Sequence, residues 1–310
     1  MKKILLVGLG RVGWTYDLAT NIHSRDSFLT HYKSLKHIQK TPSKSFELYV
    51  HDCSQDVHSR FLEEEKEGKF LQTEEELLTH EWDLVVVATS TNHILKTVEK
   101  FSTYSNSTKF LVEKPVASEL DSLRNFVNMN ANSNLLERIR VGFPRRTLNS
   151  SKHIKHIFTQ YSMKDLSFEI TFSGGVSNIF SHFLDLSEYW FGAFQLKDID
   201  AKGKFALLKG INHPEITIEV FQSSKTNNED TSIVSKNRDL FKYINSGRFI
   251  EVYDRKKEKK VVFEREIEHM LLPEAVEYVN WGLYDKPTVL TRLPSSSIEI
   301  SLALEASFAK

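Results

Sequence analysis

The sequence predicts an α/β protein in which a doubly wound parallel sheet is followed by an α+β domain with a mostly antiparallel, open-faced sheet. Three observations predict this fold class. In the first half of the chain, short apolar runs alternate with amphipathic stretches of helical period. After about Phe143, apolar and polar residues alternate one by one instead. A glycine-rich turn follows the first apolar run.

The apolar runs of the first half are continuous and often β-branched, as expected for parallel strands that are covered on both faces. They occupy residues 4–7, 48–50, 84–88, 110–112 and 139–141. The helical segments between them occupy residues 57–66, 73–78, 94–101 and 119–129. Strands and helices in alternation predict one parallel sheet with helices on both faces. We assign residues 1–143 to this domain.

The remaining residues, 144–310, are assigned to a second domain. Its alternating segments are SFEITF, EITIEVFQ, FIEVYDR and KKVVFERE. Such alternation is typical of an antiparallel sheet with one covered face. Two helical segments, 273–283 and 296–308, close the chain, and we expect the last one to pack back on the N-terminal domain. The open face of the sheet predicts pairing into a homodimer or homotetramer.

Composition excludes several classes of protein. The 310 residues contain 41 Lys and Arg and 41 Asp and Glu, so no net field attracts nucleic acid or an anionic membrane. Cys53 is the only cysteine, which excludes a disulfide framework and a thiolate metal cluster. His153 and His156 lack the spacing of a zinc pair, so no metal is expected. No apolar run is long enough to span a membrane, and Arg11 interrupts the apolar start too early for a signal peptide, so a cytoplasmic protein is expected.

The glycine-rich turn has the pattern G-x-G-x-x-G, in which Gly8, Gly10 and Gly13 enclose Arg11 and Val12. In a strand-to-helix turn the first glycine allows the bend, and the second lets a pyrophosphate approach the backbone. The third lets the following helix pack against the strand, so that the helix N-terminus faces the phosphates. The position of the motif directly after the first strand predicts a Rossmann domain that binds a dinucleotide.

An acidic residue is expected at the end of the second strand, where it binds ribose hydroxyls of the adenosine. Asp52 fills this position, and its charge would repel the 2′-phosphate of NADP, so NAD is the expected cofactor and NADP is disfavoured. Asp52 lies 39 positions after Gly13, whereas about 20 is usual. The excess indicates a lengthened segment over residues 14–45. The alternative is that Asp52 only opens a turn.

The third apolar run is followed by a polar stretch at the sheet edge where ligands of open α/β sheets bind. We expect these side chains beside the nicotinamide and its ribose, although an ordinary polar turn has the same composition. The residues are Thr89, Ser90, Thr91, Asn92 and His93.

The fourth apolar run is followed by Glu113, Lys114 and Pro115, which are expected at the same edge and beside the same cofactor. Pro115 restricts Lys114 to an extended conformation. A lysine at this edge could transfer the proton that accompanies hydride transfer. The alternative is a solvated lysine at an ordinary strand exit.

A glycine pair ends one strand of the second half and precedes a helical segment with a polar stripe. Asn178, His182, Asp185 and Tyr189 follow one another at helical spacing on this stripe. The stripe either binds a ligand or is a solvent face, and the spacing alone does not distinguish the two.

Together these motifs resemble the Gfo/Idh/MocA oxidoreductases over nearly the whole chain, and the stretch VEKPVA is the most specific of them. The resemblance implies that Lys114 is the catalytic lysine, that a cis peptide bond joins it to Pro115, and that Glu113 helps to position the site. It also implies that the second domain binds substrate and forms oligomers, and that His182 is a second acid–base residue. Asn178 stands where the family often has Asp, and because an amide takes up no proton it can only orient the substrate or His182.

The resemblance implies an NAD-dependent oxidoreductase that acts on a CH–OH group or ketone of a sugar, a nucleotide sugar or a cyclitol, with surface polysaccharide biosynthesis as one setting. Arg145 and Arg146 either bind a substrate phosphate or are surface charges, and Asp185 is a further candidate for substrate binding. Two alternatives stay open. One is a glycosidase that retains NAD and oxidises transiently, and the other is a non-catalytic protein that binds a dinucleotide or a sugar.

Overall fold

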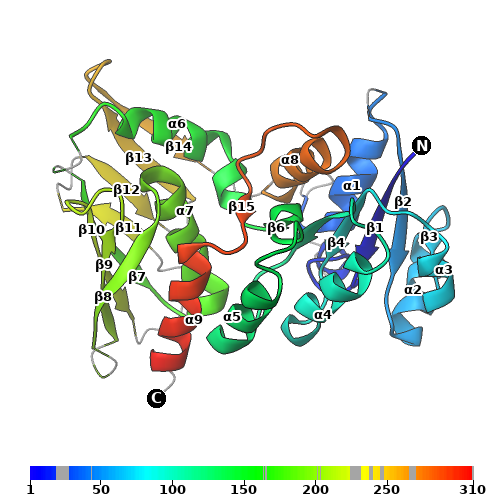
Figure 1. Ribbon diagram of the computed structural model, residues 1–310. Helices are drawn as coiled ribbons and strands as arrows, with labels where there is room; N and C mark the ends of the chain where they lie inside the picture. The colour runs from blue at the N-terminus through cyan, green and yellow to red at the C-terminus, as the bar shows by residue number, and fades with distance from the viewer. Residues whose placement is uncertain are drawn as a thin grey trace. The chain divides into compact units, whose positions relative to one another are not determined.

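The chain forms two compact units (Figure 1). The first contains Met1–Pro144 and Glu268–Leu293, and the second contains Arg145–Ile267 and Pro294–Lys310. The computed structural model describes residues 1–18, 28–42, 44–162, 164, 166–200, 202, 204–223, 232–236, 240–244, 248–264 and 270–308, without the side chains of Glu74 and Asn178. Part of the lengthened segment predicted over 14–45, namely residues 19–27 and 43, lies outside this description.

The first unit contains strands and helices that alternate along the chain. Its strands are β1 (Lys2–Val7), β2 (Phe46–His51), β3 (Lys69–Phe70), β4 (Leu84–Val87), β5 (Lys109–Val112), β6 (Ile139–Val141) and β15 (Thr291–Arg292). Its helices are α1 (His31–Gln39), α2 (Gln55–Glu64), α3 (Glu74–Leu78), α4 (Thr91–Ser102), α5 (Leu120–Met129) and α8 (Leu271–Tyr284), with short helical turns η1 (Thr15–Asp17) and η2 (Leu136–Arg138). A further turn, η3 (Pro144–Thr147), begins at the last residue of this segment.

The described strands of the first unit form one sheet in the order β15-β6-β5-β4-β1-β2-β3. Strands β1 to β6 pair in parallel, and β15 pairs antiparallel with β6. The order reverses between β1 and β4, as in the doubly wound sheets that bind dinucleotides at this point. The predicted parallel, doubly wound sheet is confirmed.

Both faces of this sheet are buried, which explains the continuous apolar runs. Ile4 and Leu6 of β1 belong to a core that also contains Tyr32 of α1 and Tyr278 of α8. Leu5 between them is equally buried and, because strand side chains alternate, points to the opposite face. Figure 1 shows α1 and α8 on one face of the sheet and α4 and α5 on the other.

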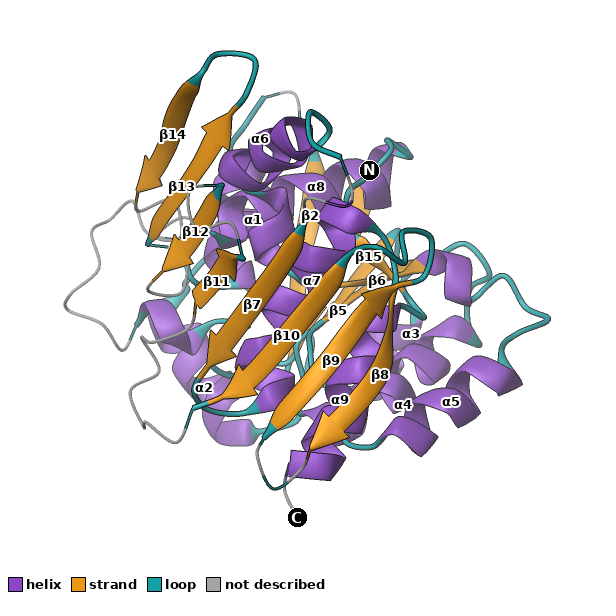
Figure 2. Cartoon of the chain, turned by 90° about the vertical axis from the view of Figure 1, so that its left-hand side faces the viewer, coloured by secondary structure: helices purple, strands orange, loops and turns teal. Residues whose placement is uncertain are grey.

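The second unit contains strands β7 (Ser167–Phe172), β8 (Phe194–Asp200), β9 (Phe205–Gly210), β10 (Thr217–Gln222), β11 (Ser232–Ser235), β12 (Phe241–Ile244), β13 (Phe249–Asp254) and β14 (Lys259–Glu264). Its helices are α6 (Asn149–Phe158), α7 (Ser181–Phe191) and α9 (Ser296–Phe308), and a π-helical turn, η5 (Val176–Phe180), directly precedes α7. The described strands form one sheet in the order β14-β13-β12-β11-β7-β10-β9-β8, which Figure 2 shows as a single row.

Neighbouring strands of this second sheet are antiparallel except for β7 and β10, which pair in parallel. Buried residues alternate with exposed or half-buried ones in β7, β9, β10 and β13, so one face is covered and the other is open. The predicted mostly antiparallel, open-faced sheet is confirmed. The short alternating segments of β8, β9, β11 and β12 are strands that the sequence analysis did not predict.

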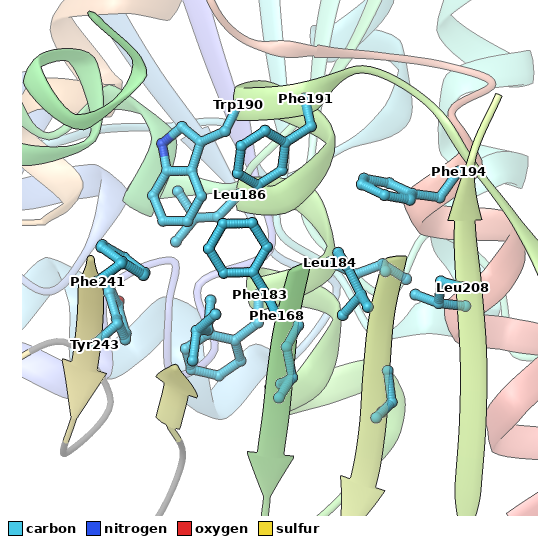
Figure 3. Close-up of a cluster of buried hydrophobic side chains, with 14 of the residues drawn as sticks. Phe168, Phe183, Leu184, Leu186, Trp190, Phe191, Phe194, Leu208, Phe241 and Tyr243 are labelled. Carbon is cyan, nitrogen blue, oxygen red and sulfur yellow. The ribbon is translucent and has the colours of Figure 1, made fainter. Parts of the chain in front are cut away.

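The covered face of the second sheet packs against α7 through a cluster rich in aromatic residues (Figure 3). Phe183 and Trp190 extend from α7 toward the strands, where Trp190 meets Phe241 with ring centroids 5.4 Å apart. The rings of Phe168 and Phe191 stack with centroids 5.0 Å apart. Burial of these aromatic side chains stabilises the packing of α7 on the sheet.

The two units differ from the predicted division at the C-terminal end. The second domain was predicted to hold all of residues 144–310, with the last helix packing back on the first domain. Instead α8 and β15 belong to the first unit. Ala275 and Val279 of α8 pack in the core of the first sheet, whereas Leu304 of α9 packs in the core of the second. Each helix lies where its apolar face is buried.

No helix in the described part of the chain is long and apolar enough to cross a membrane. Among the same residues, no group of His, Cys, Asp and Glu side chains is arranged to hold a metal ion.

The packing of α8 on the first sheet gives a stability prediction. A Cβ atom on Gly282 would lie 2.9 Å from Cδ2 of Leu84, a fully buried residue of β4. We expect Gly282→Leu to lower the free energy of unfolding by about 1–3 kcal/mol through overpacking. Urea denaturation measures this change. Val276→Ala, at an exposed position of the same helix, should shift stability by no more than about 0.5 kcal/mol. Equal stability of both variants would mean that α8 does not pack on β4.

Candidate dinucleotide site

A cleft of about 450 Å³ opens at the carboxyl ends of β1, β2 and β4 in the first unit. It lies where the strand order reverses, the position at which open α/β sheets bind ligands. Six of the predicted cofactor-binding residues line it. They are Gly8, Gly10, Asp52, Thr89, Ser90 and His93.

Gly8 is required by the close approach of two strand ends. Its φ of +95° lies in a region that side chains rarely adopt. A Cβ atom here would lie 2.6 Å from the carbonyl carbon and oxygen of Ala88, directly after β4. Gly13 is constrained in the same turn, because its Cβ would overlap the carbonyl oxygen of Gly8. Packing within the protein therefore explains the first and third glycines of the motif.

Gly10 has a different environment. A Cβ atom at Gly10 would have no atom of the described residues within 4 Å, and Gly10 lines the cleft. None of the described residues therefore fills the space that a side chain at Gly10 would occupy. This is the environment expected for a glycine that lets a pyrophosphate approach the backbone.

The predicted helix directly after the glycine turn is absent from the described residues. Only the short turn η1 follows, and α1 begins at His31. The first N–H groups of α1 are used within the protein: His31 donates to the carbonyl of Val12 at 3.0 Å, and Tyr32 donates to that of Gly13 at 3.0 Å. The prediction that this helix N-terminus faces the phosphates is therefore wrong, because the glycine turn itself accepts its hydrogen bonds.

Asp52 ties the end of β2 to the glycine turn. Its Oδ2 accepts a hydrogen bond from the N–H of Leu9 at 2.8 Å, and its Oδ1 accepts one from the N–H of Ser54 at 2.9 Å. The second bond is the turn interaction that was the alternative for this residue. A carboxylate has about four acceptor positions, so both bonds leave capacity for ribose hydroxyls. Asp52 thus opens a turn and also lines the cleft.

The polar stretch after β4 lies at the N-terminus of α4. Thr89 and Ser90 line the cleft together with His93, while Thr91 and Asn92 begin α4 beside them. The Oγ1 atom of Thr89 is buried and has no hydrogen-bond partner among the described residues. A buried hydroxyl without a partner is costly, so this atom fits a ligand group in the cleft.

Lys114 lies at the exit of β5, and the peptide bond between it and Pro115 is cis, as the resemblance implied. Lys114 is half-buried rather than fully solvated. The carboxylate of Glu113 accepts from the N–H of Lys114 at 3.3 Å and lies 2.8 Å from Nε2 of His31. His31 was not predicted as a site residue, because it falls in the lengthened segment over residues 14–45, for which the sequence indicated no role.

In the second unit, the π-helical turn η5 alters the predicted polar stripe. Its hydrogen bonds span five residues, so a stripe drawn at α-helical spacing from Asn178 does not continue straight into α7. The side chain of Asn178 lies outside the described part. His182 and Tyr189 are half-buried, whereas Asp185 is fully buried. The solvent-face alternative is therefore wrong for Asp185.

Arg146 and Asp185 form a buried ion pair. The Nε of Arg146 donates to Oδ2 of Asp185 at 2.8 Å, and its Nη2 donates to Oδ1 and to the backbone carbonyl of the same residue. Arg146 is 7% exposed, so the alternative that it is a surface charge is wrong. The pair holds η3 against α7.

Arg145 lies next to this pair and also points into the second unit. Its Nη1 donates to the hydroxyl of Tyr243 at 2.5 Å, and its guanidinium lies 5.2 Å from the ring centroid of Phe183. Burial raises the pKa of Tyr243, so the phenol stays protonated near neutral pH. Arg145, like Arg146, is thus engaged with the aromatic core of its own unit.

No protein-family model matches the sequence, and no curated protein matches it significantly. Solved structures do match the fold. A Gfo/Idh/MocA family oxidoreductase from Vibrio cholerae is 14% identical and superposes with a TM-score of 0.64 over 100% of this chain and 96% of its own. The chain has the Gfo/Idh/MocA fold. An oxidoreductase from Agrobacterium radiobacter, solved with NAD+, L-tartaric acid and magnesium, is 14% identical with a TM-score of 0.68 and the same coverage.

Proteins with this fold differ in what they do. UDP-N-acetylglucosamine 3-dehydrogenase from Acidithiobacillus ferrooxidans is 15% identical, with a TM-score of 0.65 over 99% of this chain and 95% of its own. The super-repressor mutant of Gal80p from Saccharomyces cerevisiae is 16% identical, with a TM-score of 0.66 over the same shares. The Gfo/Idh/MocA fold therefore accommodates both a dehydrogenase and a repressor. The function of this chain has to be inferred from the residues of its site and not from its fold.

The different environments of Gly8 and Gly10 give a second prediction. We expect Gly8→Ala to lower the free energy of unfolding by about 2–5 kcal/mol, because the methyl group meets the backbone of Ala88 and the backbone conformation is strained. Gly10→Ala should change stability by no more than about 0.5 kcal/mol. Thermal denaturation of the two variants measures this. Similar losses for both variants would contradict the assignment of Gly10 to a ligand.

Proposed function

We propose that this chain is an NAD-dependent oxidoreductase that moves hydride between the nicotinamide ring and a hydroxyl or ketone carbon of a sugar-like substrate. The observation that supports it most is the cleft of the first unit. Among the described residues, no atom occupies the space beside Gly10, and the buried hydroxyl of Thr89 has no partner. Asp52 lines the same cleft directly after β2. These features together fit a dinucleotide better than a general polar pocket.

The glycine turn and Asp52 would hold opposite ends of the adenosine diphosphate portion. Among the described residues, no backbone carbonyl accepts a hydrogen bond from the N–H groups of Gly10, Arg11, Val12 and Gly13. Successive backbone N–H groups in a turn form an anion site, which suits the pyrophosphate. The carboxylate of Asp52 suits two ribose hydroxyls and repels a 2′-phosphate, which favours NAD over NADP.

NAD, when bound, supplies the acceptor or donor of hydride. In the oxidation direction the substrate loses a hydride from carbon and a proton from oxygen, and Lys114 receives that proton as a neutral amine. Its half-buried position at the exit of β5 supports this role. The resemblance assigns the second acid–base role to His182 and an orienting role to Asn178.

Within the class of sugar-like substrates we propose a nucleotide sugar, as used in surface polysaccharide biosynthesis. The shared fold with UDP-N-acetylglucosamine 3-dehydrogenase supports this choice. Because Arg146 is paired with Asp185, we do not assign either side chain to the substrate.

A second candidate is a protein that binds the dinucleotide without turning over a substrate. Two observations favour it: the likeness in fold to Gal80p, and Asn178 at the position where the family often has an acid. The two candidates share the cofactor cleft and differ in the requirement for Lys114.

The cofactor assignment is tested by calorimetry. We expect NAD to bind at least about 10-fold more tightly than NADP, because Asp52 repels the additional phosphate. Asp52→Asn keeps an oxygen that accepts from Leu9 but removes the charge, so the preference for NAD should shrink toward parity. Cys53→Ala, which changes another residue of the same cleft, should leave it unchanged. Failure of the wild-type protein to bind either dinucleotide would refute the proposed function.

The catalytic assignment is tested by NADH absorbance across a panel of nucleotide sugars, free sugars and cyclitols. We expect Lys114→Met to lower kcat about 10²–10⁴-fold with NAD affinity preserved, because it removes the group that exchanges the proton. Lys96→Met, at an exposed position of α4, is the matched control and should keep full activity. NAD binding without turnover of any substrate would favour the non-catalytic candidate.

A further inference from the structure

The first unit contains a buried cluster of polar side chains beside the Lys114 turn. It consists of His31 at the start of α1, Glu113 at the exit of β5, and Glu274 and Tyr278 on α8. His31, Glu274 and Tyr278 are fully buried, and the side chain of Glu113 is 12% exposed. Three segments that are distant in the sequence thus place ionisable groups together, which is costly unless the groups are hydrogen-bonded.

Both ring nitrogens of His31 lie within hydrogen-bond distance of another member of the cluster. Nε2 lies 2.8 Å from Oε1 of Glu113, and Nδ1 lies 3.3 Å from the hydroxyl of Tyr278. Burial raises the pKa of Tyr278 well above its usual value, and the charges of Glu274 and Glu113 raise it further, so the phenol keeps its proton. An ionised carboxylate only accepts. A proton on Nε2 of His31 therefore fits the contact to Glu113, which can only accept, while Nδ1 lies beside the hydroxyl of Tyr278.

Glu113 connects His31 to the Lys114 turn. Its backbone N–H donates to the carbonyl of Val87 at 2.9 Å, which continues the β4–β5 ladder. One carboxylate oxygen faces His31, and the other accepts from the N–H of Lys114. Gly142 leaves space for this carboxylate, because a Cβ there would lie 3.2 Å from Oε1 of Glu113 and 3.5 Å from Oε1 of Glu274. The orientation of the carboxylate is thus set from several sides.

His31 also contacts the glycine turn of the cofactor cleft. Its backbone N–H donates to the carbonyl of Val12 at 3.0 Å, and the neighbouring Tyr32 N–H donates to that of Gly13. His31 therefore contacts the glycine turn through its backbone and the Lys114 turn, at Glu113, through its side chain. In the described part of the chain these contacts link two parts of the site that are separated by about a hundred residues of sequence.

We propose that His31 is a positioning residue for Lys114: its Nε2–H holds the carboxylate of Glu113, which in turn holds the Lys114 turn in register with the glycine turn. This proposal rests on the proposed oxidoreductase function. It gives a role to the described end of the lengthened segment, which supplies His31. The imidazole is not among the residues that line the cofactor cleft, and its side-chain contact toward the Lys114 turn is to Glu113, so it acts through that carboxylate.

The test compares two substitutions of His31 in the full chain. Leu removes the donor, whereas Gln keeps an N–H that can reach Glu113. We expect His31→Leu to lower kcat about 10–100-fold through misplacement of the lysine. KM and NAD affinity should stay within about 3-fold, because the backbone contact to Val12 remains. His31→Gln should recover most of the lost kcat. An unchanged kcat in His31→Leu, or equal losses in both variants, would overturn the proposal.

His58 provides the matched control. It is buried in the same unit, and its ring nitrogens lie within hydrogen-bond distance of Gln55 and Gln72 rather than of Glu113. His58→Leu should cost stability but leave kcat unchanged. A loss of kcat in His58→Leu as large as in His31→Leu would show a general effect of removing a buried histidine, and it would overturn the specific role.

Nitrogen NMR of the wild-type imidazoles tests the contact separately from the reaction and from the folding of the variants. We expect His31 to carry its proton on Nε2, with a signal that shifts in Glu113→Gln. A proton on Nδ1 alone would overturn the proposal, because Nε2 could then not donate to Glu113. NAD binding without any turnover would refute the proposed oxidoreductase and with it the positioning role. Turnover that is insensitive to His31→Leu would refute the positioning role alone.

Discussion

The ends of β1 and β4 approach each other so closely that only a glycine fits between them. Gly8 adopts a positive φ with its α-carbon against the backbone of Ala88. This contact sets the floor of the cleft, because the chain leaves both strands at the point where the strand order reverses. The positions of Gly10 and Thr89 follow directly from it. The carboxylate of Asp52 then fixes the turn from the side through Leu9.

Segments that are distant in the sequence complete the first unit. The helix α8 crosses back to the parallel sheet and buries Ala275 and Val279 against it. The same helix brings Tyr278 and Glu274 to the neighbourhood of Glu113. The beginning of α1 approaches from another direction and supplies His31. A structural core and a polar cluster are thus built from the same two helices, and the polar cluster lies beside the lysine expected to do chemistry.

The second unit is held together by an aromatic core and a buried ion pair. Aromatic side chains from α7 and the sheet dominate its core, and the Arg146–Asp185 pair holds η3 to α7 within it. A buried ion pair stabilises little in net terms, but removing one partner leaves an uncompensated charge. The pair therefore works as a constraint on where α7 lies, and α7 carries His182. The sequence pattern could not separate this structural role from substrate binding, because Arg and Asp serve both.

The sequence by itself determined the strands and turns that depend only on neighbouring residues. Continuous β-branched runs predict buried parallel strands, and one-by-one alternation predicts a sheet with one covered face. The spacing of Gly8, Gly10 and Gly13 predicts the turn after β1, and the stretch around Lys114 predicts the turn after β5. These inferences succeed because period and backbone freedom are properties of neighbouring residues.

Contacts between distant residues were decided only by the tertiary structure. Nothing near His31 in the sequence indicates that its ring meets Glu113, or that its N–H uses the carbonyl of Val12 in place of a phosphate. The assignment of α8 to the first unit and of α9 to the second depends on which sheet buries each apolar face. The π-helical turn that directly precedes α7 is likewise absent from the predicted helical spacing. Such features depend on packing against partners that the local pattern does not contain.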